Sequence, residues 1–254
     1  MSFTRSKKAP CEICSKKQLS KKSELYKLKS GNTHLRKYLP ADDKLIEFND
    51  VKMKPEIVYL EGLKPNTTFF YFATNPRDFT LPILKFVDAY DKLQNSGVNR
   101  TSANGKAEVL IGCPQIYLAE DGNIYSRHFH IIYWNKANKQ WGTTIYTHQI
   151  FCNVNKSFVK KMLNNPKVVI LDALSEDMFT QNHIPGAINL PASHKWTLSE
   201  ITARLPKGTN TTTPMILYCY NTKCNAAEKL WKQLNHLGYY NTMHYSGGIT
   251  EWTK

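Results

Sequence analysis

Two cysteines near the C-terminus have the spacing and surroundings of a reactive thiol site. Residues 215–219 read MILYC, an apolar run that ends in Cys219, and Cys224 follows five positions later. The apolar spacing after Cys224 predicts a helix that ends at Gly238. In such a place, loop N–H groups and the helix dipole lower the pKa of a thiol and favour the nucleophilic thiolate. Lys223 adds a positive charge nearby.

The sequence pattern on both sides of this loop predicts a small α/β domain. Residues 168–174 (VVILDAL) and 215–219 are apolar runs typical of buried parallel strands, and AINLP predicts another short strand. Helical patterns alternate with them at SEDMFTQNH, TLSEITARL and AAEKLWKQLNHLGY, and Ser175 is the predicted N-cap of the first. Parallel sheets bind ligands where strands end and helices begin, so the alternation puts Cys219 at such a point.

Residues 168–252 resemble a rhodanese domain. Four signatures occur in order: ILDA, HIPGAINLP, LYCYNTKC and LGYYNTMHYSGGITEW. The resemblance implies a sulfurtransferase whose active-site cysteine is Cys219. This cysteine would carry a persulfide from a sulfane donor such as thiosulfate to a thiol or cyanide acceptor. It also implies a substrate-binding loop whose N–H groups hold the sulfur, formed by Tyr220, Asn221, Thr222, Lys223, Cys224 and Asn225.

The sequence departs from the family's pattern at several positions. The residues after the strand aspartate, Asp172, are Ala and Leu where the family often has arginine, and the loop lacks the frequent Arg-Ser pair. The related phosphatases have arginine six residues after their cysteine, where it grips the phosphate. Asn225 occupies that position here, which argues against a phosphatase.

Each candidate residue also has a structural interpretation. Cys219 would be a buried core cysteine if the module were inactive. Cys224 is either a packing residue or a resolving thiol that takes sulfur from Cys219 or forms a disulfide with it. His183 is assigned to the turn before the AINLP strand rather than to a catalytic base. The alternative to an enzyme is a non-catalytic interaction or structural protein that uses the module as a docking surface.

Residues 51–152 predict a β-rich, sandwich-like domain. Runs rich in Val, Ile, Tyr and Phe alternate with Gly and Asn turns: EIVYLEGL, TTFFYFAT, AEVLIGCPQIYL, HFHIIYW and TTIYTHQIFC. The segment LPILKFVDAYDKLQN has helical apolar spacing instead. The FFYF run at residues 69–72 is interpreted as core. Residues 153–254 then form the rhodanese-like domain.

The HFH stretch at residues 128–130 puts two imidazoles on the same face of a predicted strand. Neighbouring strands add further soft and imidazole donors, which together could form a metal site. We favour an outward polar face instead, and therefore predict neither a metal nor a cofactor. The candidate ligands of the alternative are His128, His130, His148, Cys113 and Cys152.

A second resemblance involves the same stretch. Residues 105–117 followed by RHFHIIYW resemble the transthyretin-like sandwich of intradiol dioxygenases. The resemblance implies an iron ion held by a His-x-His pair together with tyrosines, for which Tyr117 and Tyr125 are available.

Residues 1–50 predict a flexible basic arm with one short helix around residues 20–29. The whole chain has 34 Lys and Arg against 20 Asp and Glu, a net charge of +14. This charge permits binding to nucleic acid or another polyanion. Cys11 and Cys14 make half of a zinc site, and no second pair follows at finger spacing, so we expect two exposed thiols.

The 254 residues, 41% of them hydrophobic, are enough for one large or two modest folded domains. The sequence has no apolar run of transmembrane length and no secretory signal, which predicts an intracellular, cytoplasmic protein without a membrane partner. A virion location would follow if the chain is viral, as its lysine and asparagine bias would suit. Six cysteines in such a protein predict thiols rather than a disulfide framework. The sequence leaves the oligomeric state open.

Overall fold

The computed structural model describes residues 26–27, 37–46 and 55–254. Two compact units divide these residues. The first unit contains the described residues up to 77 together with 84–123 and 127–150, and the second contains 78–83, 124–126 and 151–254. None of the helices in the described ranges is long and apolar enough to cross a membrane. Cys11 and Cys14 lie outside the described residues.

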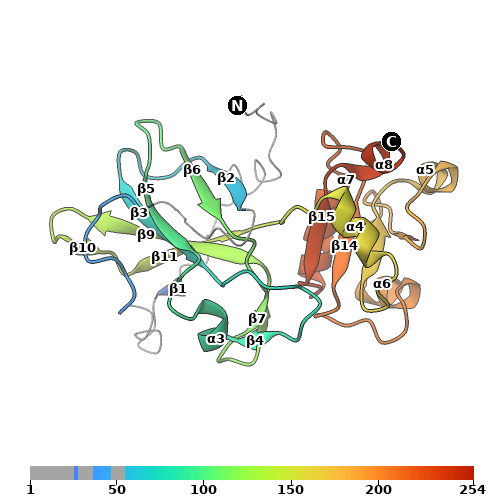
Figure 1. Ribbon diagram of the computed structural model, residues 1–254, viewed down its shortest axis with the longest axis horizontal. Helices are drawn as coiled ribbons and strands as arrows, with labels where there is room; N and C mark the ends of the chain where they lie inside the picture. Colours follow the sequence, from blue (N-terminus) through green and yellow to red (C-terminus); the bar gives the residue numbers. More distant parts are fainter. Residues whose placement is uncertain (1–25, 28–36, 47–54) are drawn as a thin grey trace. The chain divides into compact units, whose positions relative to one another are not determined.

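A six-stranded antiparallel sheet organises the first unit (Figure 1). Its strand order is β1-β11-β9-β3-β5, and β10 also pairs with β9. Strand β3 is buried along its whole length, which confirms the interpretation of the FFYF run as core. The strands are β1 (Tyr26–Lys27), β3 (Thr68–Ala73), β5 (Ser96–Arg100), β9 (His128–Asn135), β10 (Gln140–Trp141) and β11 (Thr144–Gln149).

The remaining strands of this β-rich region are short. Strand β2 (Glu56–Leu60) pairs antiparallel with β6 (Ala107–Ile111), and β4 (Leu84–Lys85) pairs parallel with β7 (Tyr117–Leu118). Strand β8 (Ile124–Tyr125) has two residues. The five predicted β runs therefore all form strands, whereas the sandwich remains a prediction.

Three local features differ from the sequence prediction. The helical pattern at residues 81–95 forms a helix only at α3 (Phe86–Tyr90). Strand β5 was not predicted because its SGVNR sequence lacks an apolar alternation; Gly97 is needed there because a side chain would collide with the ring of Tyr71. The predicted helix around residues 20–29 is wrong at β1, which pairs with β11.

The second unit is built on a four-stranded parallel sheet of order β13-β12-β14-β15. The strands are β12 (Val169–Asp172), β13 (Ile188–Asn189), β14 (Met215–Tyr218) and β15 (Thr242–Tyr245). Every residue of β12 and β14 is buried, as expected for parallel strands covered on both faces. This confirms the predicted α/β domain with a parallel sheet.

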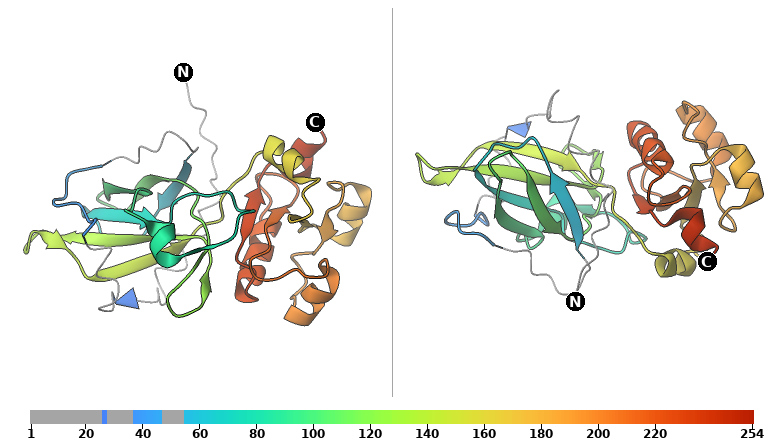
Figure 2. Two further views of the ribbon diagram at one scale, coloured as in Figure 1. Left: turned by 60° about the horizontal axis from the view of Figure 1, so that its bottom comes forward. Right: turned by 90° about the horizontal axis from the view of Figure 1, so that it is seen from above.

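Figures 1 and 2 show the helices of this unit gathered around its strands. Three helices begin at predicted or related caps: the side chains of Asn155, Ser175 and Thr197 each accept a hydrogen bond from the N–H three residues later. These caps fix where each crossover connection turns into helix. The helices are α4 (Lys156–Met162), α5 (Glu176–Gln181), α6 (Leu198–Arg204), α7 (Ala226–His236) and α8 (Gly248–Trp252).

The loop after β14 rests on the first residues of α8. The N–H groups of Ile249 and Thr250 donate to the carbonyl oxygens of Cys219 and Tyr220, both at 3.0 Å. Gly248 has a φ of +58°, and a Cβ there would lie 2.7 Å from the carbonyl group of Tyr220. A residue without a side chain is therefore needed for the loop and α8 to approach this closely.

We expect backbone strain in the variant Gly248→Ala to lower the free energy of unfolding of the second unit by about 1–3 kcal/mol. The collision of the added Cβ with the carbonyl group of Tyr220 should increase this loss. Chemical denaturation followed by tryptophan fluorescence measures the loss. Gly186→Ala is the matched control, because Gly186 has a φ of +76° but nothing lies within 4 Å of an added Cβ. Equal losses at the two positions would show that the close approach at Gly248 does not matter.

Candidate active site at the end of strand β14

Cys219 directly follows the buried strand β14, as the sequence predicts. Its side chain is buried, with 1% of the residue exposed. The preceding residue, Tyr218, is also buried, and its hydroxyl accepts a hydrogen bond from the N–H of Ile184 at 2.9 Å. The backbone on both sides of the sulfur is thus held by the core of the unit and by α8.

The loop from Tyr220 to Asn225 curls back toward Cys219. The carbonyl oxygen of Asn221 accepts from the N–H of Cys224 at 3.0 Å, and its side-chain oxygen accepts from the N–H of Lys223 at 2.9 Å. This turn brings Cys224 next to Cys219, whose thiol lies 3.4 Å from the carbonyl oxygen of Cys224. Both cysteines are free thiols.

The pKa values of the two thiols shift in opposite directions. The Cys219 thiol donates to the sulfur of Cys224, and backbone N–H groups of Tyr220, Ala226 and Asn221 add to this effect, so the pKa of Cys224 falls to about 6 although burial opposes the shift. The sulfur of Cys224 and burial together raise the pKa of Cys219. Because the two thiols interact strongly, they titrate as a pair, and the shifts favour the first thiolate on Cys224.

The N–H groups that reach the sulfurs come from the loop and from α7. Those of Tyr220 and Asn221 contribute, whereas the N–H groups of Lys223 and Cys224 donate within the loop. The first two residues of α7, Ala226 and Ala227, donate instead. The general rule that the first turn of a helix leaves its N–H groups without intrahelical partners could have indicated them.

Asp172 ends the neighbouring strand β12 and is fully buried. Burial raises the pKa of its carboxyl, although hydrogen bonds with Tyr218 and with the N–H of Leu174 oppose the shift. His183 stacks on Phe179 at a ring distance of 4.0 Å and hydrogen-bonds the carbonyl oxygen of that residue. These contacts are those of the structural role expected for His183.

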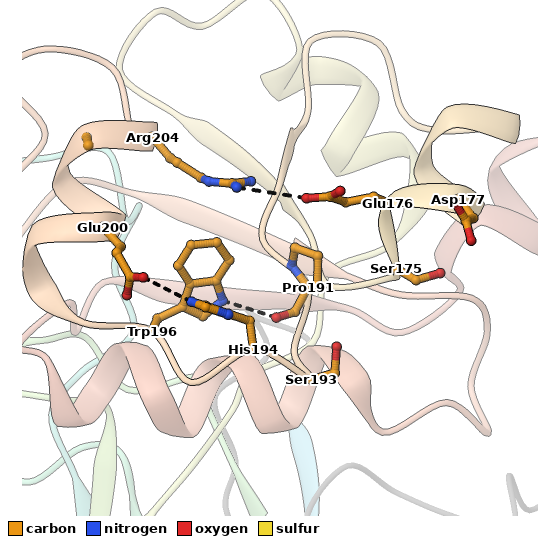
Figure 3. Close-up of a pocket in the computed structure, with 10 residues that line it drawn as sticks. Ser175, Glu176, Asp177, Pro191, Ser193, His194, Trp196, Glu200 and Arg204 are labelled. Carbon is orange, nitrogen blue, oxygen red and sulfur yellow. Dashed lines mark hydrogen bonds and ion pairs between the residues drawn. The ribbon is translucent and has the colours of Figure 1, made fainter.

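A pocket of about 600 Å³ lies elsewhere in the same unit, between α5 and α6 (Figure 3). Two pairs of polar side chains line it: Arg204 lies 3.8 Å from Glu176, and His194 lies 3.2 Å from Glu200. Neither Cys219 nor its loop lines this pocket. We therefore assign the thiol chemistry to the loop and no role to the pocket.

The structure does not bring together all five candidate metal ligands of residues 51–152. Cys113 and Cys152 are disulfide-bonded, so the expectation that the cysteines are thiols is wrong for these two. His148 stacks on Phe129, on the face of the sheet opposite to His130. Among the described residues, no three His, Cys, Asp or Glu side chains lie close enough together to hold a metal ion.

The expectation that His128 and His130 form an outward polar face is wrong. His128 is buried, and both imidazoles contact the hydroxyl of Tyr90. Burial also lowers the pKa of His130 well below its usual range, so its ring is neutral. The Tyr117 hydroxyl lies 3.3 Å from Nε2 of His128, whereas Tyr125 lies in β8 and Tyr90 was not anticipated.

The lowered pKa of Cys224 predicts an unusual pH dependence of thiol alkylation. With iodoacetamide, the rate at Cys224 should rise through about pH 6 and then level off, because the thiolate predominates above its pKa. In Cys219→Ala the inflection should move up toward the ordinary thiol value of about 8.5, since the donated hydrogen bond is lost. Peptide mapping by mass spectrometry identifies the alkylated residue. An inflection at the ordinary thiol pKa in the parent protein would contradict the lowered pKa of Cys224.

The comparisons with known proteins concern this unit. Residues 155–254 match the family model described as a rhodanese-like domain. The single-domain sulfurtransferase RDL2 of Saccharomyces cerevisiae is 20% identical, with 41% of this chain and 90% of that one covered and a TM-score of 0.37. The human single-domain sulfurtransferase TSTD1 is 18% identical, with 40% and 94% covered and a TM-score of 0.35. A search of curated proteins finds no match. Residues 155–254 of this chain form a rhodanese-like domain.

Proposed function

We propose that the second unit is a sulfurtransferase that carries a persulfide on Cys219. The observation that carries the proposal is the placement of a thiol at the end of β14, beside a second thiol, with backbone N–H groups from the loop and from α7 directed at the two sulfurs. Such N–H groups stabilise an anionic sulfur, whether thiolate or persulfide. The rhodanese-like fold of the unit adds support.

The proposed reaction has two balanced steps. In the first, the Cys219 thiolate attacks the outer sulfur of a sulfane donor such as thiosulfate. The bond between that sulfur and the sulfite group breaks, sulfite leaves with the electron pair, and a persulfide remains on Cys219. In the second step, the thiolate of an acceptor attacks the outer persulfide sulfur. The acceptor leaves as a persulfide, and the Cys219 thiolate is restored without an external oxidant.

The sulfur of Cys224 accepts the proton that Cys219 must lose. In the resting pair the Cys219 thiol donates to the Cys224 sulfur, so a proton shift along this hydrogen bond makes the Cys219 thiolate without release of a proton to water. Since Cys219 is buried, the thiolate would form away from bulk solvent, next to the N–H group of Ala227. Cys224 therefore assists the nucleophile in this proposal and does not merely pack beside it.

Intact-mass analysis after incubation with thiosulfate tests the persulfide. We expect the parent chain to gain one sulfur that is removed by a reductant, and Cys219→Ser to gain none. Cys113 and Cys152 act as internal controls, since disulfide-bonded cysteines offer no thiol. If sulfur accumulates on Cys224 in the Cys219→Ser variant at the parental rate, the assignment to Cys219 is wrong. If neither cysteine gains sulfur, the docking-module alternative explains the domain better.

The role of Cys224 as a resolving thiol makes a separate prediction. The variant Cys224→Ser should still form the persulfide, because the nucleophile and the N–H groups remain. Mild peroxide should join the two cysteines of the parent in a disulfide that reductant reverses. In the variant it should oxidise Cys219 irreversibly, since no neighbouring thiol traps the sulfenic acid. Equal rates of irreversible oxidation in the two proteins, measured by mass spectrometry, would show that Cys224 is only a packing residue.

A further inference from the structure

The first turn of α8 holds two consecutive peptide groups of the loop that follows β14. The carbonyl oxygen of Cys219 accepts a hydrogen bond from the N–H of Ile249, and that of Tyr220 accepts one from the N–H of Thr250, both at 3.0 Å. The hydroxyl of Thr250 donates a further hydrogen bond to the same Tyr220 oxygen at 2.6 Å. The Tyr220 carbonyl thus accepts from both donors of one residue.

The opposite edges of these two peptide groups face the sulfurs. Both peptide bonds are trans, and a trans peptide is planar, so its N–H points away from its C=O. The peptide that carries the Cys219 carbonyl also carries the N–H of Tyr220, which reaches both sulfurs. The peptide that carries the Tyr220 carbonyl also carries the N–H of Asn221, which reaches the sulfur of Cys224. The contacts with α8 on one edge therefore set the direction of the N–H groups on the other.

The loop needs this support more than α7 does. Ala226 and Ala227 begin an 11-residue helix, and the helix itself fixes the direction of their N–H groups. Tyr220 and Asn221 belong to no helix or strand. The side chain of Tyr220 is also a weak anchor, since the residue is 44% exposed. The direction of the loop N–H groups must therefore come from contacts of the backbone.

The Thr250 hydroxyl adds a second constraint on the Tyr220 carbonyl. A carbonyl oxygen has two lone pairs, so the hydroxyl and the N–H of Thr250 can each occupy one. Two donors on one oxygen restrict the rotation of the peptide group more than one donor does. Hydrogen bonds accepted by a carbonyl also polarise its peptide and strengthen the N–H on the other edge as a donor.

We propose that Thr250 is a positioning residue of the thiol site, whose hydroxyl and N–H hold the Tyr220 carbonyl so that the N–H of Asn221 stays directed at the sulfur of Cys224. The residue acts through the peptide group that joins Tyr220 and Asn221. The inference rests on the proposed sulfur transfer only for its effect on the persulfide, because the resting thiol pair has the same contacts with α8.

The hydroxyl should matter most when the site is charged. Hydrogen bonds to an ionised group are about twice as strong as those between neutral groups, so a misdirected N–H costs the thiolate more than the thiol. Loss of the hydroxyl should therefore raise the pKa of Cys224. A persulfide anion on Cys219 would lose stabilisation for the same reason.

The variant Thr250→Val keeps the shape of the side chain and removes the hydroxyl. In the full chain, the inflection of Cys224 alkylation by iodoacetamide should move up from about pH 6 by about half a pH unit. Sulfur uptake from thiosulfate should slow about threefold. Thr250→Ser should restore both properties, because it keeps the hydroxyl. Thr250→Ala, which also lacks the hydroxyl, should reproduce the effect of Thr250→Val.

Amide resonances distinguish positioning from a general loss of structure. In the parent, the ¹H–¹⁵N signals of Asn221 and Ala226 should both move as Cys224 ionises, because both N–H groups reach its sulfur. In Thr250→Val the movement at Asn221 should shrink, whereas that at Ala226 should remain, because α7 holds its N–H. An equal reduction at the two amides would show a structural role only and would overturn the proposal.

Thr253→Val is the matched control on the same helix. The Thr253 hydroxyl donates at 3.0 Å to the carbonyl oxygen of Ile249 within α8. This variant should match the parent in the alkylation profile and in the Asn221 signal, and circular dichroism should be the same for both valine variants. The same shifts in Thr253→Val as in Thr250→Val would contradict a specific role for Thr250.

The measurements separate this inference from the proposed sulfur transfer. If the parent gains no sulfur from thiosulfate, the alkylation profile and the amide signals still decide the role of Thr250. If the parent gains sulfur and Thr250→Val matches it in rate, inflection and Asn221 signal, the positioning role is wrong and the proposed transfer stands.

Discussion

The burial of strand β14 between two parallel neighbours is the constraint on which the thiol site depends. All four residues of β14 are buried, and the strand pairs with β12 on one side and β15 on the other. A strand held in this way cannot slide along its neighbours without exposing apolar side chains, so its carboxyl end has one position. Cys219 directly follows that end. The start of α8 donates backbone hydrogen bonds to the loop, and Gly248 allows the close approach that these bonds require.

The same constraint explains why the loop can stabilise an anion without an arginine. The strand end and α8 fix the loop, the loop turns on Asn221, and α7 begins directly after it. The N–H groups at the start of α7 then point at the sulfurs, because the first turn of a helix has no internal acceptors for them. Backbone donors do not titrate, so they remain available to the sulfurs at any pH at which the unit is folded.

The first unit shows how the two-residue period of a strand distributes side chains between the two faces of a sheet. Alternation along β9 places His128 and His130 on one face and Phe129 on the other, where it stacks with His148. The paired strand β11 contributes Thr147 to the histidine face, while α3 and β7 contribute tyrosines.

Features that depend on local pattern could be predicted from the order of the amino acids. Apolar runs and turn residues located the strands, Ser175 marked the start of α5, and the strand-to-helix junction identified Cys219. Periodicity also showed that His128 and His130 share a face. These features need only neighbouring residues, because the period of an element and the chemistry of its caps are local properties.

Which distant groups meet could be seen only in the folded chain. Whether the His128 face points outward or inward depends on what covers it, and Tyr90 reaches it from a five-residue helix that lies 38 positions earlier. The turn of the loop on Asn221 redirected two N–H groups and left Ala226 and Ala227 to face the sulfurs. The need for glycine at residue 248 arises from a carbonyl group nearly thirty residues away. Such contacts are set by how buried surfaces pack together, and a linear pattern contains no record of that packing.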